Sequence, residues 1–328
     1  MVKIEDKGRA KTIEVTNKTG LKIVLCTYGA SVFSLKVNDK PLILEFENFD
    51  EFLDSLGYHG KTLGRVAGRI LSPIEIDGVK YELKKELDFP YALHGGSQTS
   101  LSYVNWDYKI KKGLGFTSVV FSILDKDLNN GFPGNVLFKI TYKIFNNKNE
   151  FRLIQEAKTD KKTYINLSNH MYFSFSNDLN LSDYVLKMDA SRYGDVRKDI
   201  LITETKQVPE MLNFKEGAKL GEKLDIIEKE SFLGTIDNTF LFDNSTDSEA
   251  DVTLENQDFK LVLNTNYPAM NIYLDNSMGD QKFVNNKGIN KRRAIALEPQ
   301  LYDLELDSIT FDKNHSYKYF INYQIISK

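Results

Sequence analysis

The sequence contains one cysteine among 328 residues, and this scarcity excludes two kinds of architecture. A single thiol cannot form an intrachain disulfide, and it cannot contribute to a metal site built from several cysteines. Cys26 lies inside the apolar run Lys-Ile-Val-Leu-Cys-Thr-Tyr at residues 22–28. We therefore interpret Cys26 as a small core residue rather than as a catalytic nucleophile.

Long hydrophobic segments and a strong net charge are also missing. Residues 1–8 lack the apolar stretch of a secretory signal peptide, and no apolar run approaches the length of a membrane span. We therefore expect a cytoplasmic protein. The formal net charge is only −3, so neither nucleic acid nor an anionic membrane is an expected partner.

Nucleotide-binding and metal-binding patterns are absent from the sequence. The chain has no Gly-x-x-x-x-Gly-Lys-Ser/Thr and no Gly-x-Gly-x-x-Gly. The glycine-rich stretch 64–70 lacks the phosphate-loop pattern, but its apolar neighbours suggest that one of Arg65 and Arg69 is buried and binds a hydroxyl group. No His/Cys cluster or Asp-rich loop has the spacing of metal ligands, and we expect no metal.

Strand-like segments dominate what is present. Asp77-Gly78 separates residues 74–76 from 79–83 and predicts a hairpin with a type I′ turn, because both residues tolerate positive φ angles. A second hairpin is predicted from 137–145 and 151–157. Further strands are predicted within 12–37 and at 184–189, 259–264, 270–274, 294–298 and 317–326.

Helical signals are few, with one segment at 49–56 and a turn near 215–227. Many short strands at close spacing are typical of a large antiparallel β-sandwich. No Pro/Gly/Ser-rich linker, charge block or clean repeat divides the chain. We predict an all-β fold that forms a single domain over residues 1–328.

Three residues carry the clearest chemical signal. Glu298 ends the apolar run at 294–298, where Pro299 is expected to stop the strand, and a carboxylate there is costly unless it has a task. His94 precedes Gly95 and Gly96, which let the backbone approach a ligand closely. His170 lies in Ser-Asn-His-Met-Tyr-Phe. A neutral imidazole donates and accepts while a carboxylate only accepts, so a His–Glu pair can move protons without a metal.

The sequence around the other polar residues indicates a functional role less specifically. Strand alternation would put Tyr172 on the same face as His170, where it could wall the same pocket. Asp237, in Ile-Asp-Asn-Thr-Phe, is most simply a turn residue. Nothing near His59 or His315 supplies a role, and we interpret both as structural.

Seven motifs, in order along nearly the whole chain, resemble those of the galactose mutarotase, or aldose 1-epimerase, family. None is decisive alone, and their shared order carries the resemblance. They are Gly-Arg-Val-Ala-Gly-Arg-Ile at 64–70, Leu-His-Gly-Gly at 93–96 with Trp106 downstream, Asn-Gly-Phe-Pro-Gly-Asn at 130–135, Asn-His-Met-Tyr-Phe at 169–173, Asp-Asn-Thr-Phe at 237–240, Asn-Ile-Tyr-Leu-Asp-Asn at 271–276 and Leu-Glu-Pro-Gln at 297–300.

The resemblance implies a β-supersandwich that interconverts the α and β anomers of free aldohexoses such as galactose or glucose. It assigns Glu298 as the base at the C1 hydroxyl and His170 as the acid at the ring oxygen, with His94 hydrogen-bonded near that oxygen. Arg69 and Asp237 would bind sugar hydroxyls. No cofactor is implied, because nothing is oxidised and no group is transferred.

Departures from the family pattern leave this acid–base pair intact. Gly68 stands where many members carry a substrate-contacting Asn, and Asn271 takes the place of a longer Gln. The residues that follow the His94 motif, ending Ser-Tyr-Val at 102–104, and the Glu298 motif, Leu-Tyr-Asp at 301–303, also differ. We expect these positions to read sugar hydroxyls, so they leave the preferred sugar open.

Two alternatives remain. A hexose-phosphate 1-epimerase would need a cationic pocket, and Lys291-Arg292-Arg293 is the only basic cluster near Glu298; we interpret this cluster as a solvated loop. A non-catalytic carbohydrate-binding sandwich is also compatible with the fold, although His170 and Glu298 weigh against it. In each case the expected partner is a small-molecule sugar, bound by a monomer or homodimer.

Overall fold

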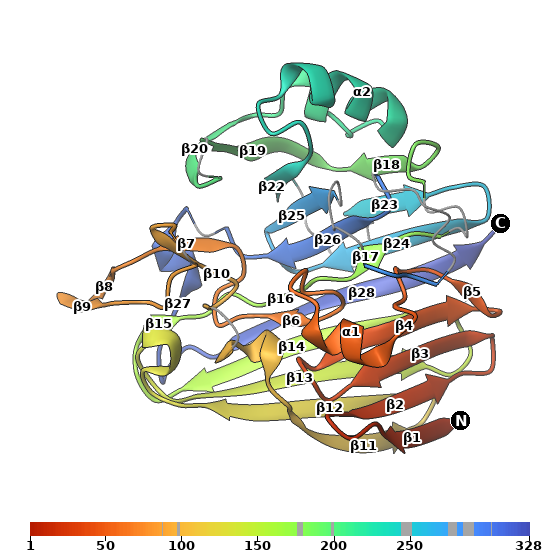
Figure 1. The fold of residues 1–328 in the computed structure, drawn as a ribbon, viewed down its shortest axis with the longest axis horizontal. Helices are drawn as coiled ribbons and strands as arrows, with labels where there is room; N and C mark the ends of the chain where they lie inside the picture. Colours follow the sequence, from red (N-terminus) through yellow and green to blue (C-terminus); the bar gives the residue numbers. More distant parts are fainter. Residues whose placement is uncertain are drawn as a thin grey trace.

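The computed structural model describes residues 1–86, 88–96, 99–175, 180–197, 200–243, 251–274, 281–284, 292–302 and 304–328. The described strands form three large sheets and several two-stranded ribbons, and their pairings are antiparallel (Figure 1). The predicted all-β, antiparallel class is confirmed.

The first two sheets carry most of the core. The five-stranded sheet has the order β1 (Val2–Asp6), β2 (Lys11–Thr16), β3 (Leu21–Cys26), β4 (Ser31–Val37) and β5 (Lys40–Pro41). The nine-stranded sheet has the order β11 (Asp107–Gly113), β12 (Phe116–Asp125), β13 (Val136–Phe145), β14 (Glu150–Thr159), β28 (Tyr317–Ser327), β24 (Phe259–Thr265), β23 (Val252–Glu255), β18 (Val185–Met188) and β21 (Ala218–Lys219).

The remaining strands surround the candidate site. The six-stranded sheet has the order β17 (Tyr172–Phe173), β26 (Ile295–Gln300), β25 (Ala269–Leu274), β22 (Asp237–Phe242), β19 (Ala190–Val196) and β20 (Ile202–Gln207). The ribbons pair β10 (Tyr91–Leu93) with β7 (Arg69–Leu71), β16 (Ser168–Asn169) with β6 (Thr62–Leu63), β15 (Thr163–Tyr164) with β27 (Thr310–Phe311), and β8 (Ile74–Ile76) with β9 (Val79–Tyr81).

Helices are short. The α-helices of the described residues are α1 (Phe49–Asp54) and α2 (Leu220–Glu230), close to the two predicted segments, and neither is long and apolar enough for a membrane crossing. Single 3₁₀ turns occur at η2 (Leu101–Tyr103), η3 (Asn129–Gly131), η4 (Glu210–Leu212) and η5 (Leu306–Ile309).

Both predicted hairpins are confirmed. Asp77 and Gly78 have φ angles of 53° and 78°, as a type I′ turn between β8 and β9 requires. Strand β13 pairs with β14 over their full lengths. Its buried residues alternate with more exposed ones, which is the period of a strand covered mainly on one face.

The expectation that Pro299 ends its strand is wrong. Strand β26 continues to Gln300, and Pro299 pairs with Met270 of β25. On the other side of β26, strand β17 pairs only with Ile295 and Ala296. A proline is tolerated in a strand where its nitrogen has no ladder partner, and Pro299 lies beyond the paired part of that edge.

The sequence did not reveal the strands between 107–125, 190–207, 237–242 and 252–255. Strand β20 shows why, because five of its six residues are exposed and no apolar alternation marks it. Strand β22 was missed for another reason. Its residues Asp237, Asn238 and Thr239 are polar and nevertheless buried, so the sequence shows no apolar pattern there. The interpretation of Asp237 as a turn residue is therefore wrong, since it begins this strand.

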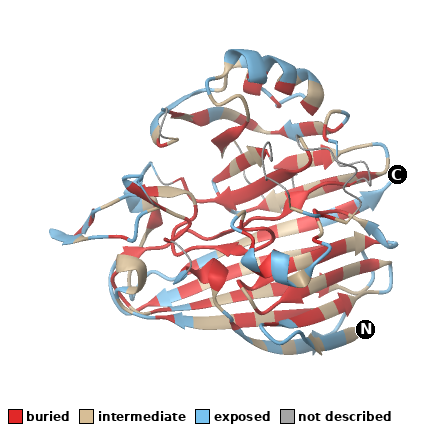
Figure 2. Cartoon of the chain, in the orientation of Figure 1, coloured by how far each residue is buried: buried red, intermediate tan, exposed pale blue. Residues whose placement is uncertain are grey.

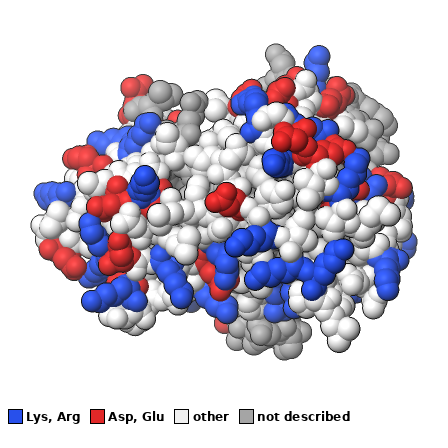
Figure 3. Space-filling view, turned by 90° about the horizontal axis from the view of Figure 1, so that it is seen from below, with Lys and Arg blue, Asp and Glu red and all other residues white. Residues whose placement is uncertain are grey.

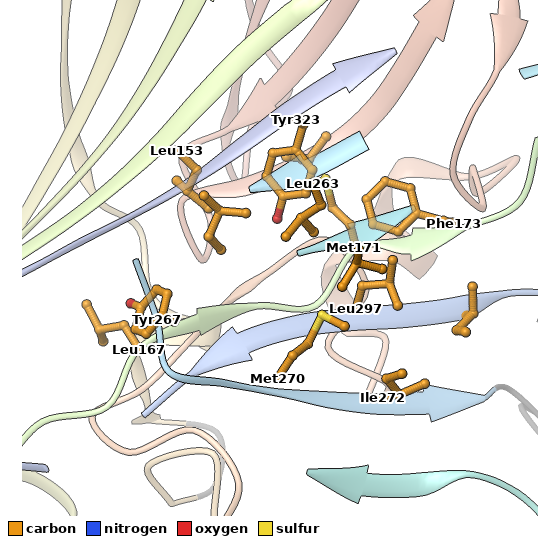
Figure 4. Packing of buried hydrophobic residues seen from close by; sticks show 14 of the residues in the cluster. Leu153, Leu167, Met171, Phe173, Leu263, Tyr267, Met270, Ile272, Leu297 and Tyr323 are labelled. Carbon is orange, nitrogen blue, oxygen red and sulfur yellow. The ribbon is translucent and has the colours of Figure 1, made fainter. Parts of the chain in front are cut away.

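The core is continuous through the sheets. Buried residues run along the middle of the large sheets (Figure 2). Beneath β25 and β26, the side chains of Met270, Ile272 and Leu297 pack close to Leu263 and Tyr323 (Figure 4). This apolar layer supports the strands that carry the candidate site on their opposite face.

Charged side chains of both signs are scattered over one face of the molecule. On the face seen from below, lysine and arginine are interspersed with aspartate and glutamate, without one sign dominating the whole face (Figure 3). This agrees with a solvated surface, as the small net charge indicates.

Arg65 is an internal arginine with a buried carboxylate partner. The Arg65 guanidinium donates through Nε and Nη2 to Asp125 Oδ2, at 2.9 and 2.6 Å, and through Nη1 to the Pro133 carbonyl. The side chains of Arg65 and Asp125 are 1% and 9% exposed. The buried arginine of the 64–70 stretch is therefore Arg65, and it fastens the end of β12 and the 130–135 motif to the segment that leads into β7.

We predict that Asp125→Ala lowers the free energy of unfolding by roughly 3–5 kcal/mol, because it leaves the Arg65 charge buried without its partner. Chemical denaturation of the variant and the wild type measures this difference. The matched control is Glu156→Ala, which breaks a half-exposed pair with Lys139 and should cost less than about 1 kcal/mol. Equal losses in both variants would contradict the structural role of Arg65.

Candidate active site

A single cavity of about 660 Å³ brings together the seven site residues predicted from the sequence. It lies over the face of β22, β25 and β26 that is turned away from the main core, and it is walled by the β7–β8 segment, by Val196 and Arg197, and by residues 200–203. The seven lining residues are Arg69, His94, His170, Tyr172, Asp237, Asn271 and Glu298.

The floor of the cavity follows from strand alternation. Glu298 pairs with Asn271, which pairs with Thr239, so the three neighbouring strands present one polar row. Gln300, two positions after Glu298, lies on the same face and also lines the cavity. Glu298 is 1% exposed, and both its carboxylate oxygens lack a hydrogen-bond partner among the described residues.

His170 lies between β16 and β17 and faces Glu298. Its Nε2 is 3.4 Å from Glu298 Oε1, and its Nδ1 is buried without a hydrogen bond within the described part of the chain. The Tyr172 ring packs at 4.6 Å from the imidazole, and the Tyr58 ring is near-parallel to it at 6.3 Å. These rings fix the imidazole plane, and Tyr172 lines the same cavity as His170, as strand alternation suggested.

His94 is held by backbone geometry. It follows β10 with a φ of 48°, and its amide donates to the Gly68 carbonyl. In return, the Gly68 amide donates to His94 Nδ1 at 3.1 Å. A side chain at Gly95 is impossible, because its Cβ would lie 2.0 Å from the Gly64 carbonyl oxygen. Gly95 thus lets the two segments meet closely enough for this reciprocal contact.

The hydrogen bond from Gly68 settles the tautomer of His94. A backbone N–H can only donate, so Nδ1 must accept and the proton of the neutral ring resides on Nε2. Burial, with His170 and Arg69 adding to it, lowers the pKa of His94 well below its ordinary value. His94 is therefore a neutral hydrogen-bond donor.

Opposite charges are paired on the wall of the cavity. Arg69 Nη2 donates to Asp237 Oδ2 at 2.9 Å, and Asn271 Nδ2 donates to Asp237 Oδ1 at 3.3 Å. Thr239 donates to Asn271 Oδ1 at 3.2 Å. Arg69 Nε is buried and takes no part in this chain of contacts.

Burial governs the protonation of the facing pair. It raises the pKa of Glu298 to about 8, an effect that the nearby Asp237 charge reinforces. It lowers the pKa of His170 to about 4, although Asp237 acts in the opposite direction. Between these values the pair holds one proton, which rests on Glu298 and which His170 can receive through a bound molecule.

His94, His170 and Glu298 also form a group of ligand-type atoms, all within 4.8 Å of one another. A metal bound at His94 Nε2 would require the proton to move to Nδ1, where it would face the Gly68 N–H. The backbone therefore disfavours a metal at this place and favours an oxygen atom that accepts a hydrogen bond.

The remaining histidines and the cysteine lie where structural roles were expected. His59 is buried, contacts Ser55 through Nδ1 at 2.7 Å and packs against Tyr172, so it supports the site from behind. His315 is exposed and contacts Asp312. Cys26 is buried, and burial raises the pKa of its thiol to about 11, which leaves it protonated.

The basic cluster near Glu298 is not a solvated loop. Arg292 pairs with Asp225 and Glu228 of α2, and Arg293 is completely buried against the Phe283 ring. Neither lines the cavity. Lys291 lies outside the described residues.

The departures from the family pattern divide into two groups. Gly68 and Asn271 line the cavity, as expected of residues that read a ligand, whereas the described residues at 102–104 and 301–302 do not. Tyr103 instead packs behind Tyr58 at 5.3 Å. The motif positions Asp275, Asn276 and Asp303 lie outside the described residues.

Sequence reasoning missed Tyr58, Tyr273 and Gln300 in the lining. Two of them carried a signal, since Tyr273 and Gln300 stand two positions after Asn271 and Glu298 and thus on the same strand faces. Tyr58 precedes His59 and packs at 4.6 Å from His94. Its φ of 54° belongs to an irregular loop whose path the sequence does not reveal.

Fold and site together define a galactose mutarotase-like β-sandwich with a histidine–glutamate centre. The family model described as Aldose 1-epimerase matches residues 11–324. The chain belongs to this family.

Individual relatives agree. The chain is 25% identical over 338 residues to an aldose 1-epimerase from Streptococcus thermophilus, covering 97% of this chain and 95% of that protein. It is 30% identical over 169 residues to a maltose epimerase from Levilactobacillus brevis, covering 50% and 49%. The structure of galactose 1-epimerase from Lactobacillus acidophilus NCFM superposes with a TM-score of 0.86 at 22% identity, covering 100% of this chain and 99% of that one.

We predict that His94 is neutral at about pH 6, near the ordinary imidazole pKa, and carries its proton on Nε2. Long-range ¹H–¹⁵N spectra of histidine-labelled protein distinguish the two tautomers and the cation. The His94→Gln variant assigns the resonance. A cationic ring, or a proton on Nδ1, would contradict the hydrogen bond from Gly68.

Proposed function

We propose that this protein is an aldose 1-epimerase that interconverts the α and β anomers of free aldohexoses such as galactose or glucose. The observation that carries the proposal is the pair of Glu298 and His170. The facing atoms, His170 Nε2 and Glu298 Oε1, lie 3.4 Å apart, and the two side chains are 6% and 1% exposed. We further infer that residues 1–328 act as one domain, because one core includes strands from β2 to β28.

In the proposed reaction, the shared proton first passes from Glu298 to His170, whose facing atoms lie 3.4 Å apart. The ionised Glu298 then removes the proton from the C1 hydroxyl while His170 protonates the ring oxygen. The C1–O5 bond breaks to give the open-chain aldehyde, and rotation about C1–C2 exposes its other face. Ring closure returns both protons with the roles reversed. The pair gains and loses one proton in each half of the cycle, so no oxidant or group carrier is required.

The other lining residues orient the sugar. His94 is a fixed donor and suits the ring oxygen or a hydroxyl oxygen as its acceptor. Arg69, Asp237 and Asn271 present both donors and acceptors to hydroxyl groups. Holding the ring in one orientation lowers the entropic cost of reaching the reactive geometry.

No observation favours the hexose-phosphate alternative. The 291–293 cluster on which it depended contributes neither Arg292 nor Arg293 to the cavity. Of the two described arginines that line it, Arg69 is paired with Asp237 and Arg197 is exposed. The proposed substrate is therefore an uncharged sugar.

We predict that Glu298→Gln lowers the rate of mutarotation by about 10²–10⁴-fold, the usual contribution of a general acid or base. The measurement is the optical-rotation change of freshly dissolved α-D-glucose or α-D-galactose. Glu222→Gln, an exposed change on α2, is the control and should leave the rate unaltered. If the wild type accelerated no free aldose, the proposed function would be wrong; a fully active Glu298→Gln variant would remove Glu298 from the mechanism.

The pH dependence tests the shared proton. The raised pKa of Glu298, about 8, and the lowered pKa of His170, about 4, predict that kcat/KM falls above the first value and below the second. Above about pH 8 the pair has lost its proton, and below about pH 4 it holds two. The rate without enzyme is subtracted at each pH. If kcat/KM already fell at about pH 6.5, the ordinary pKa of an imidazole, burial would not control the protonation of the pair.

A further inference from the structure

Lys61 is a lysine enclosed in the interior, outside the lining of the cavity. It is 0% exposed, and its Nζ donates to the carbonyls of Leu53 and Ser55 at 3.0 and 3.1 Å. The Tyr103 ring lies 4.2 Å from Nζ, within the range of a cation–π contact. Burying an amine costs free energy that an apolar side chain of similar length would not lose. The lysine therefore joins two parts of the chain at a local cost.

The carbonyls that Lys61 binds belong to the end of α1. A helix leaves its last carbonyls without partners inside the helix, and a donor from elsewhere can satisfy them. No basic residue lies in the last turn of α1 itself, so Lys61 supplies this group from outside. Burial lowers the pKa of Lys61 to about 7, although Cys26 and Asp54 act in the opposite direction. A neutral amine still has two N–H groups, one for each carbonyl, so the contact persists when the charge is lost.

The backbone of the same residue holds the candidate acid. The His170 amide donates to the Lys61 carbonyl at 3.0 Å, and the Gly60 amide donates to the His170 carbonyl at 2.8 Å. The Lys61 amide donates to the Tyr58 carbonyl at 2.9 Å and closes a turn. This turn carries the Tyr58 ring against His94 and His170. The side chain of Lys61 thus anchors the turn to α1, and its backbone anchors His170 to the turn.

We propose that Lys61 is a positioning residue of the epimerase: its buried side chain holds the turn at 58–61 and, through that turn, sets the place of His170 relative to Glu298. This inference rests on the proposed epimerase function. It assigns no proton transfer to Lys61. The distance that matters is the 3.4 Å between His170 Nε2 and Glu298 Oε1, since a displacement of about 1 Å in a reacting group can cost about 10²-fold in rate.

Other elements hold the residues that would bind sugar hydroxyls. Arg69 lies in β7, Asp237 in β22 and Asn271 in β25. Arg69 and Asn271 both donate to Asp237, and these contacts do not pass through the turn at 58–61. Loss of the Lys61 anchor should therefore slow the chemical step more than it weakens sugar binding.

The first test is Lys61→Met in the polarimetric assay with α-D-glucose and α-D-galactose. Methionine has a similar length but no donor for the two carbonyls. We expect kcat per folded molecule to fall by about 10–100-fold, while KM changes by less than about threefold. Lys61→Gln keeps a shorter donor and should lower kcat in the same way, which provides a second variant if Lys61→Met does not fold.

The matched control is Ile144→Ala, a fully buried change on β13 that does not line the cavity. It should lower the free energy of unfolding and leave kcat and KM unaltered. If the Lys61 variants lost stability but kept the wild-type kcat, Lys61 would be only structural and the inference would be wrong. A loss confined to KM, or failure of both Lys61 variants to fold, would overturn it as well.

The second test does not use activity. In long-range ¹H–¹⁵N spectra of histidine-labelled protein, the ring signals of His170 should shift in Lys61→Met and stay in place in Ile144→Ala. The His170→Gln variant assigns these signals. Unchanged His170 signals in an active enzyme would overturn the inference and leave the proposed function standing. A wild type that accelerates no free aldose would overturn both.

Discussion

The alternation of side chains along β25 and β26 is the constraint on which the rest of this structure depends. Met270, Ile272 and Leu297 point into the apolar core (Figure 4), whereas Asn271 and Glu298 line the cavity. A slip of one residue in the pairing would exchange the two sets, burying a carboxylate in the core. Tight packing on one face therefore fixes the positions of Glu298 and Asn271 on the other.

The second property that organises the site is the distribution of charge in the cavity. The one permanent ion pair in the described polar row joins Arg69 to Asp237, and it leaves the centre of the cavity without a free cation. Burial then keeps His94 and His170 neutral and makes the Glu298 carboxyl hold its proton. The centre is close to uncharged, which suits a sugar, whereas a phosphate group would lose its hydration without gaining an unpaired partner.

Much of this site could be predicted from the sequence because its reactive residues lie in short, recognisable motifs. Strand alternation placed Tyr172 beside His170, and glycine beside His94 indicated a close backbone approach. Long-range pairing was not readable: nothing near Arg65 in the chain identifies Asp125 as its partner, and nothing near Arg293 shows that it is enclosed. The prediction that Pro299 ends its strand was wrong because a proline interrupts a strand only where its nitrogen would face a paired neighbour. Gln300 was overlooked, although its register with Glu298 was sufficient to find it.

The contact from the Gly68 amide to His94 has a consequence for inhibitors. Because a main-chain group imposes the tautomer, no ordinary side-chain replacement at position 68 other than proline removes the donor that imposes it. His94 thus offers ligands a permanent N–H. Compounds whose ring oxygen is replaced by a protonated nitrogen would set donor against donor there, whereas sugar lactones would present an acceptor. Ligand chemistry for this cavity is better sought among neutral oxygen heterocycles than among iminosugars.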